Sequence, residues 1–143
     1  MLDETDTFMS VDVFGYTVWP DEGGTPLNGV IGQVFERIIG HTDYICPMIY
    51  PSHFTNGEMG FANPNAHPYE IIKQAGIYTG ERIAGQRAKY RPWLQAFNWY
   101  DDVDYEGDPH SIRLQIQAAE ETGAVGWQMW DASNRYRSPG YNK

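Results

Sequence analysis

The stretch "YICPMIYPSHF", residues 44–54, contains the change of pattern that decides the fold. Its first half, with Ile45 and Ile49 on the same parity, is typical of a buried strand. The strand then ends in "YPSH" instead of the Gly, Asn and Asp residues that surface turns favour. Two interpretations of this ending are open: a simple turn, or a position at which the polar groups of a site meet.

Strand-like patterns occur in four segments of the chain, and helix-like segments separate them. The strand-like segments are residues 8–16, 43–51, 91–99 and 124–132, and the helix-like segments are residues 28–41, 67–89 and 108–123. Asp108 and Pro109 are typical of a helix start, and Gly123 is typical of a helix end. The alternation predicts a βα repeat with parallel strands and right-handed crossovers.

Side chains of the predicted strands divide into an aliphatic face and a mixed face of polar and aromatic groups. In the first strand, Val11 and Val13 alternate with Asp12 and Phe14. A barrel wall turns aliphatic residues to the helices and a mixed set to the axis, whereas strands of an open doubly wound sheet are apolar on both faces. Because a full (β/α)8 barrel takes about 250 residues, four units predict an α/β half-barrel. We assign residues 9–137 to this half-barrel and residues 1–8 and 138–143 to tails.

The alternative fold is a small open α/β domain of the flavodoxin type. Such a domain would carry a glycine-rich phosphate loop after its first strand. The segment at that place, "PDEGG", lacks the G-x-G-x-x-G pattern. We therefore favour the half-barrel.

Composition excludes several classes of partner and site. The net charge is -9, with 19 acidic residues against 10 Lys and Arg, which argues against binding to nucleic acid or to an anionic membrane surface. No apolar run is long enough to be inserted in a membrane, and the first residues, "MLDETDTF", lack the features of a signal peptide. The single cysteine, Cys46, excludes an intrachain disulfide and a cysteine-rich zinc site. We predict no metal and no cofactor.

Five segments of the chain resemble successive landmarks of one protein family. They are "VDVFGY", "DYICPMIYPSHF", "NPNAHPYEII", "YRPWLQAF" and "GWQMWDASNRY". The family is bacterial, is described as glycoside hydrolases, has a (β/α)8 barrel and has no settled substrate. The match runs from about residue 11 to residue 136, and it implies that the strands are the fifth to the eighth of the barrel. An extracytoplasmic location is also implied by the resemblance.

One motif of that family is absent from this chain. The family carries an acidic fourth-strand motif of the type Phe-Asp-Tyr-x-Arg-Phe-Pro, which is the natural candidate for the catalytic carboxylates. The resemblance therefore implies a carbohydrate-active part of a barrel that is incomplete as an enzyme. A more distant likeness connects Met48, Tyr50 and Trp130 with sugar-lining positions of family 18 chitinases, although the acidic chitinase motif is also absent.

Two acids are candidates for catalysis, because glycoside hydrolysis usually needs a pair of carboxyl groups. Asp12 lies on the mixed parity of the first strand, and Asp131 follows the last strand. Each has a structural alternative. Asp12 could form a buried ion pair with Arg91, and Asp131 could cap the turn in "WDASN".

The candidate substrate-binding residues share strand ends or the mixed parity. They are Tyr16, Tyr50, His53, Gln95, Trp99 and Trp130. An indole ring can stack on a sugar ring, and a Gln amide supplies a donor and an acceptor for hydroxyl groups. The alternative for the aromatic residues is that they fill the core. The acidic loop "NWYDDVDYEGD" is most simply a solvated rim.

The sequence thus predicts a protein that acts on or binds an oligo- or polysaccharide. A non-catalytic carbohydrate-binding or structural half-barrel is the alternative. The edges of a half-barrel are unpaired, so we expect either a homo-oligomer or a partner that supplies the missing N-terminal half.

Overall fold

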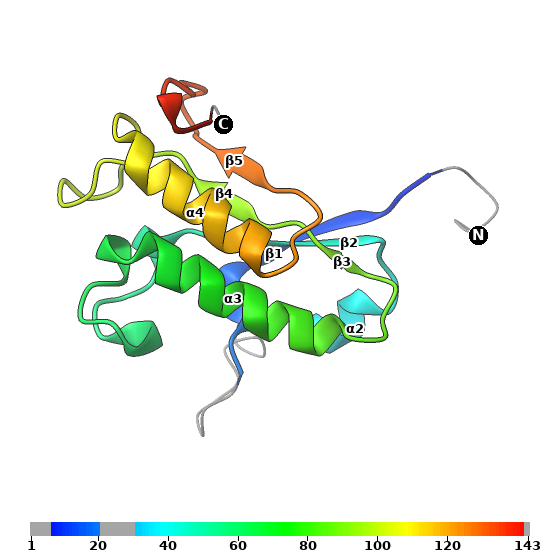
Figure 1. Cartoon of the computed structure of the whole chain (residues 1–143). Coiled ribbons are helices and arrows are strands. Elements are labelled where there is room, and N and C mark those ends of the chain that lie inside the picture. Colours follow the sequence, from blue (N-terminus) through cyan, green and yellow to red (C-terminus); the bar gives the residue numbers. More distant parts are fainter. Residues whose placement is uncertain (1–6, 21–30, 142–143) are drawn as a thin grey trace.

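The computed structural model describes residues 7–20 and 31–141, and it contains a parallel β-sheet covered by helices (Figure 1). The strands are β1 (Ser10–Phe14), β2 (Tyr44–Ile49), β3 (Lys89–Tyr90), β4 (Trp93–Gln95) and β5 (Gln128–Trp130). The helices are α2 (Phe35–Ile39), α3 (Pro68–Ile83) and α4 (Pro109–Glu121). The order across the sheet is β1-β2-β4-β5, with β3 also paired to β2, and every described pairing is parallel.

The order and direction of the four predicted strands are confirmed, but their lengths are not. The third segment, expected over residues 91–99, holds only the three residues of β4, and the separate strand β3 precedes it, beginning at Lys89, the last residue of the expected helix. Pro92 lies between them and has no N–H for the ladder, which accounts for the break. The helix expected over residues 28–41 is reduced to the five residues of α2, and its first three residues lie outside the described part, as does most of "PDEGG".

The two predicted faces of the sheet are confirmed. Helices α3 and α4 lie across one face (Figure 1), and four aliphatic side chains beneath them are fully buried. These are Val13, Ile45, Ile49 and Leu94. The opposite face carries no helix in Figure 1, and we call it the bare face. It presents the mixed parity, in which Phe14 pairs with Met48 and Met48 pairs with Trp93. Phe14 remains 51% exposed and Trp130 45% exposed.

Helices α3 and α4 approach each other closely at a glycine. A Cβ atom added to Gly76 would lie 2.0 Å from Oγ1 of Thr122. At the start of α4, Oδ1 of Asp108 accepts a hydrogen bond from the backbone N–H of His110, as the sequence predicts. The helix ends at Thr122, and Gly123 follows it with a φ of 81°. No helix in the described part is long and apolar enough to cross a membrane.

Candidate functional site

Two loops meet beyond the carboxyl ends of the strands. We call residues 50–67, after β2, the β2 loop, and residues 96–108, after β4, the β4 loop. The fully buried Gln95 joins their first residues. Its side-chain carbonyl accepts a hydrogen bond from the backbone N–H of Ser52 at 3.1 Å, and its N–H₂ group donates to the carbonyl of Phe97 at 2.9 Å. Both polar ends of the Gln95 amide are therefore used within the protein.

Further along, the same two loops are connected through Asp102. Its carboxylate accepts hydrogen bonds from the side-chain amides of Asn63 at 2.6 Å and Asn65 at 2.7 Å. The Asn63 bond is the main reason why the pKa of Asp102 lies below its usual value. The buried Tyr105 adds a third connection, because its hydroxyl donates to the carbonyl of Asn65 at 2.8 Å. The loops thus form one continuous surface.

A pocket of about 450 Å³ lies where these loops meet the end of β1, and we call it the aromatic pocket. It is lined by Phe14, Gly15, Tyr16, Met48, Tyr50, Ser52, His53, Phe54, Trp99 and Tyr100. His53 packs edge-on against Tyr50 and Trp99, with ring centroids 5.2 and 5.4 Å apart. Trp99 is 63% exposed, so its indole is accessible to a ligand.

The ionisable rings of the aromatic pocket are held in their neutral forms. Desolvation lowers the pKa of His53, so its imidazole is uncharged at pH 7 and can both donate and accept a hydrogen bond. Burial, helped by the charge of Asp12, raises the pKa of Tyr50. The pocket therefore offers apolar ring faces with uncharged polar groups, which suits a ligand that is itself uncharged.

Tyr16 is fixed by hydrogen bonds to the β2 loop. Its hydroxyl donates to Oε2 of Glu58 at 2.6 Å and also lies 3.2 Å from the carbonyl oxygen of His53. Burial and the bond to Glu58 raise the pKa of Tyr16 to about 12. Gly15 permits this arrangement, because a Cβ atom there would lie 2.5 Å from the carbonyl oxygen of Met48.

A second pocket, of about 500 Å³, adjoins the first, and we call it the polar pocket. It is lined by Ser52, His53, Phe54, Thr55, Asn56, Asn63, Tyr100 and Asp102. Ser52, His53, Phe54 and Tyr100 belong to both pockets. In the described part, no three His, Cys, Asp or Glu residues are grouped so as to hold a metal ion.

Comparison with known proteins places the chain in a family. Residues 1–136 match the family model described as "Putative glycosyl hydrolase domain". The chain belongs to this glycosyl hydrolase family. Its structure is similar to the PgaB (BpsB) glycoside hydrolase domain from Bordetella bronchiseptica, with a TM-score of 0.57 and 18% sequence identity. The similarity covers 88% of this chain and 31% of that chain, so this chain spans about a third of the other's length. No curated protein matches it.

The two predicted catalytic acids lie in different environments. Asp12 is exposed on the bare face, where Nε1 of Trp93 donates to it at 2.9 Å; no ion pair with Arg91 is found within the described residues. Asp131 is 2% exposed and follows β5. β1 and β5 are the two outermost strands in the order across the sheet, so the two acids belong to its opposite edges.

Asp131 has a structural use that its sequence context already suggested. Its Oδ1 accepts from the backbone N–H of Ser133 at 2.8 Å, and its Oδ2 accepts from the backbone N–H of Arg135 at 2.7 Å. Both carboxylate oxygens are thus engaged in holding the turn after β5.

The substrate-binding candidates of the glycosyl hydrolase domain separate into two groups. Tyr16, Tyr50, His53 and Trp99 meet in the aromatic pocket. Gln95 is buried beneath it, and Trp130 lies on the bare face, edge-on to Trp93 with centroids 6.0 Å apart.

Several residues of the two pockets were not foreseen from the sequence. Asn63, Tyr100 and Asp102 are the chief examples. The letters "ANPN" and "NWYDD" that contain them show polar loops, but nothing in either segment indicates that the two loops touch.

Proposed function

We propose that this domain binds an oligo- or polysaccharide in the aromatic pocket, as strands five to eight of a (β/α)8 glycoside hydrolase barrel. The observation that carries the proposal is the grouping of Tyr50, His53 and Trp99 beyond the carboxyl ends of parallel strands. Substrates of barrel enzymes bind at that end. An exposed indole beside polar groups is suited to a sugar ring, which has an apolar face and a hydroxylated rim.

In this proposal the bare face forms part of the barrel interior. Asp12, Trp93 and Trp130 would then line the axis, and a further set of strands would complete the wall. The acidic fourth strand typical of the family would come with that set. Because Asp131 is 2% exposed and its own turn engages both of its carboxylate oxygens, it is poorly placed to pair with Asp12, and we propose that these 143 residues do not hydrolyse glycosides alone.

The alternative is a non-catalytic carbohydrate-binding or structural half-barrel. The carboxylate of Asp131 favours this alternative, because the backbone of its own turn occupies both oxygens. The hydrolase part and the non-catalytic half-barrel would use the same pocket. They differ in whether glycosides are hydrolysed once further strands complete the barrel wall.

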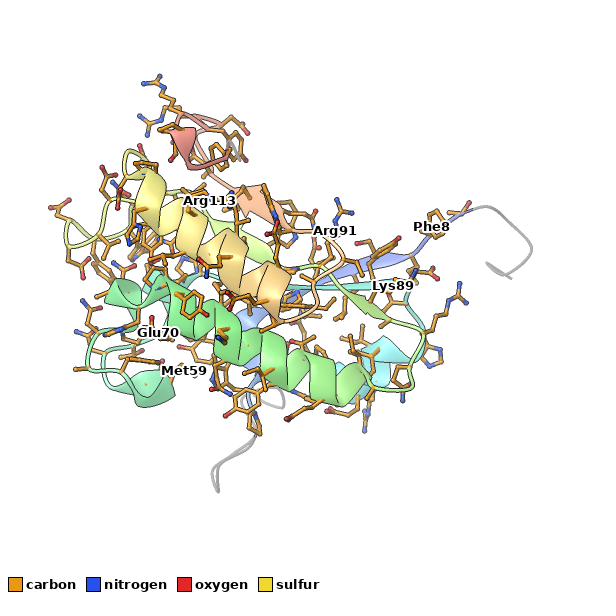
Figure 2. All side chains as sticks on the ribbon, in the orientation of Figure 1. Phe8, Met59, Glu70, Lys89, Arg91 and Arg113 are labelled. Carbon is orange, nitrogen blue, oxygen red and sulfur yellow. The ribbon has the colours of Figure 1, made fainter. Side chains whose placement is uncertain are left out.

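Binding is tested by isothermal titration calorimetry with cellohexaose, mannohexaose, N-acetylchitohexaose and a hexamer of galacturonic acid. We expect at least one neutral hexamer to bind, and Trp99→Ala to weaken its binding at least tenfold. Phe8→Ala is the matched control, since Phe8 is 72% exposed and lies at the opposite end of the molecule from Met59 of the β2 loop (Figure 2). Absence of binding to all four hexamers, or equal losses in the two variants, would contradict the proposal.

Turnover is tested by release of reducing ends from the same hexamers. We expect none from this chain alone. Hydrolysis that disappears in Asp12→Asn or Asp131→Asn, with unchanged folding by circular dichroism, would show that these acids are catalytic after all.

A further inference from the structure

The polar pocket adjoins the aromatic pocket through shared lining residues. Four residues, Ser52, His53, Phe54 and Tyr100, line both of them. Three of these shared residues, His53, Phe54 and Tyr100, carry rings. A ligand longer than one sugar ring could therefore extend from one pocket into the other.

The two pockets present different chemistry to a ligand. The aromatic pocket supplies ring faces, chiefly that of the exposed Trp99. The polar pocket supplies side-chain amides from Asn56 and Asn63 and the carboxylate of Asp102. Hydrogen bonds from two asparagine amides lower the pKa of Asp102, so it remains charged across the neutral and mildly acidic range. Each of its oxygens accepts one of these bonds, but Asp102, unlike the buried Asp131, is exposed, and each oxygen has a second lone pair for a ligand.

Ser52 gives an independent sign that a ligand belongs there. Its residue is 3% exposed, and its hydroxyl oxygen has no hydrogen-bond partner among the described residues. A buried hydroxyl without a partner carries a desolvation cost that a ligand hydroxyl would relieve. Ser52 is among the residues that line both pockets, so a ligand that spans them would pass beside it.

Charge limits the class of ligand. Among the described residues, no lysine or arginine lines either pocket, and Asp102 is the one lining carboxylate. The whole chain has a net charge of -9. An acidic sugar would place its carboxylate beside Asp102 without a neighbouring cation, which is unfavourable.

We infer that the aromatic and polar pockets are adjoining subsites for consecutive residues of an uncharged oligosaccharide, with Asp102 and Ser52 as its hydrogen-bonding residues in the polar subsite. This inference rests on the proposed carbohydrate function. It adds to that function a minimum ligand length of two sugar residues and selection against acidic sugars.

The first test measures ligand length and charge by calorimetry. For the neutral hexamer that binds best among the four tested above, the matching disaccharide should bind at least tenfold more tightly than the monosaccharide. The galacturonic acid hexamer should bind at least tenfold more weakly than the neutral hexamer. Binding of a neutral hexamer with no gain from monosaccharide to disaccharide, or with equal binding of the acidic hexamer, overturns the subsite inference and leaves the proposed function standing. No binding by any hexamer overturns both.

The second test uses matched variants. Asp102→Asn should weaken binding of the neutral hexamer about tenfold or more and reduce its advantage over the acidic hexamer. Asp101→Asn changes the same charge at an exposed neighbour that lines neither pocket, and it should change the affinity less than twofold. Equal effects of the two variants would overturn the role of Asp102.

Ser52→Ala separates binding from folding. Removal of a buried hydroxyl that has no partner should leave the thermal midpoint unchanged or raise it. The affinity for the neutral hexamer should nevertheless fall about three- to tenfold. An unchanged affinity would show that Ser52 takes no part in the subsite.

Discussion

Tyr16 shows how a single residue connects separate parts of the site. It belongs to the short turn after β1, and its hydroxyl donates to Glu58 of the β2 loop. The phenol thereby holds one wall of the aromatic pocket against another. Since the acceptor is a carboxylate, this bond is favourable only while the phenol keeps its proton.

Tyr16→Phe should destabilise the protein by about 1 kcal/mol at pH 7, because the Glu58 carboxylate loses its donor. The wild-type pKa of about 12 lies above the ordinary value of 10, so the phenol's contribution is complete below pH 10 and is lost as the pH rises to about 12. The stability difference between wild type and variant should therefore shrink over that range, as measured by urea unfolding at pH 8, 10 and 11.

Tyr78→Phe is the control for that measurement, because Tyr78 is half-buried and packs edge-on against Trp19. Removal of the Tyr78 hydroxyl should not lower the free energy of unfolding at pH 7 as Tyr16→Phe does. A Tyr16→Phe variant as stable as Tyr78→Phe would show that the bond to Glu58 contributes nothing to folding.

The positions of individual site residues were predictable when the residues directly follow a strand. Tyr50 and His53 follow β2, and the end of a parallel strand in a barrel is where ligands bind, so their positions could be inferred. The role of Asp102 could not, because it depends on contact between loops nearly 40 residues apart in the chain. Gln95 was predicted to bind substrate hydroxyls, but its fully buried amide bonds to the two loops instead.

At the level of secondary structure, the packing of α3 on α4 depends on one missing side chain. Gly76 lies on the buried side of α3 and allows Thr122 to approach. Gly80, one turn later in the same helix, is exposed, and a Cβ atom added to it would meet no neighbouring atom within 4 Å. The two glycines therefore provide an internal comparison of packing and helix propensity.

Gly76→Ala should lower the free energy of unfolding by about 1–3 kcal/mol, because the added methyl group forces α4 away. Gly80→Ala should raise it by up to about 1 kcal/mol, because alanine favours the helix more than glycine does. Urea unfolding of the two variants beside the wild type gives both values. Equal changes in the two variants would mean that the close approach of the helices does not limit stability.

The type and order of the helices and strands were predictable from the sequence. Their first and last residues were predicted less accurately. Helices α3 and α4 have long periodic patterns with proline at their starts, so both starts were found to within a residue, although α3 already ends at Ile83. Helix α2 was overestimated, because the apolar spacing of Val34 and Ile38 continues a helical pattern that the backbone adopts only from Phe35 onward. The division between β3 and β4 is signalled by Pro92, although the surrounding residues alternate as in one continuous strand.

For the whole molecule, the important feature is the contrast between the two faces of the sheet. Helices α3 and α4 cover one face (Figure 1), while Phe14 and Trp130 on the other face are about half exposed. Parallel sheets are normally covered on both faces. Burial of the exposed part of Trp130, roughly 100 Å², would contribute about 2–3 kcal/mol to association.

We therefore expect the chain to self-associate through its bare face when no other partner covers it. Sedimentation velocity should show an average mass that rises with concentration. Trp130→Glu should reduce this rise, whereas Ile77→Glu should not, since Ile77 is 41% exposed on α3 at the other face. A folded monomer at every concentration tested would contradict the expectation.

The labelling rate of Cys46 can report how often the sheet opens locally. This residue is the chain's single cysteine, it is fully buried, and its Sγ lies 3.2 Å from the hydroxyl of Ser10 on the neighbouring strand. A thiol reagent can reach it only after a local opening around this buried sulfur, and burial also raises the pKa of the thiol. The labelling rate therefore measures how often this opening occurs. A molecule that docks on the bare face would lower the labelling rate, and no engineered reporter is needed to see it.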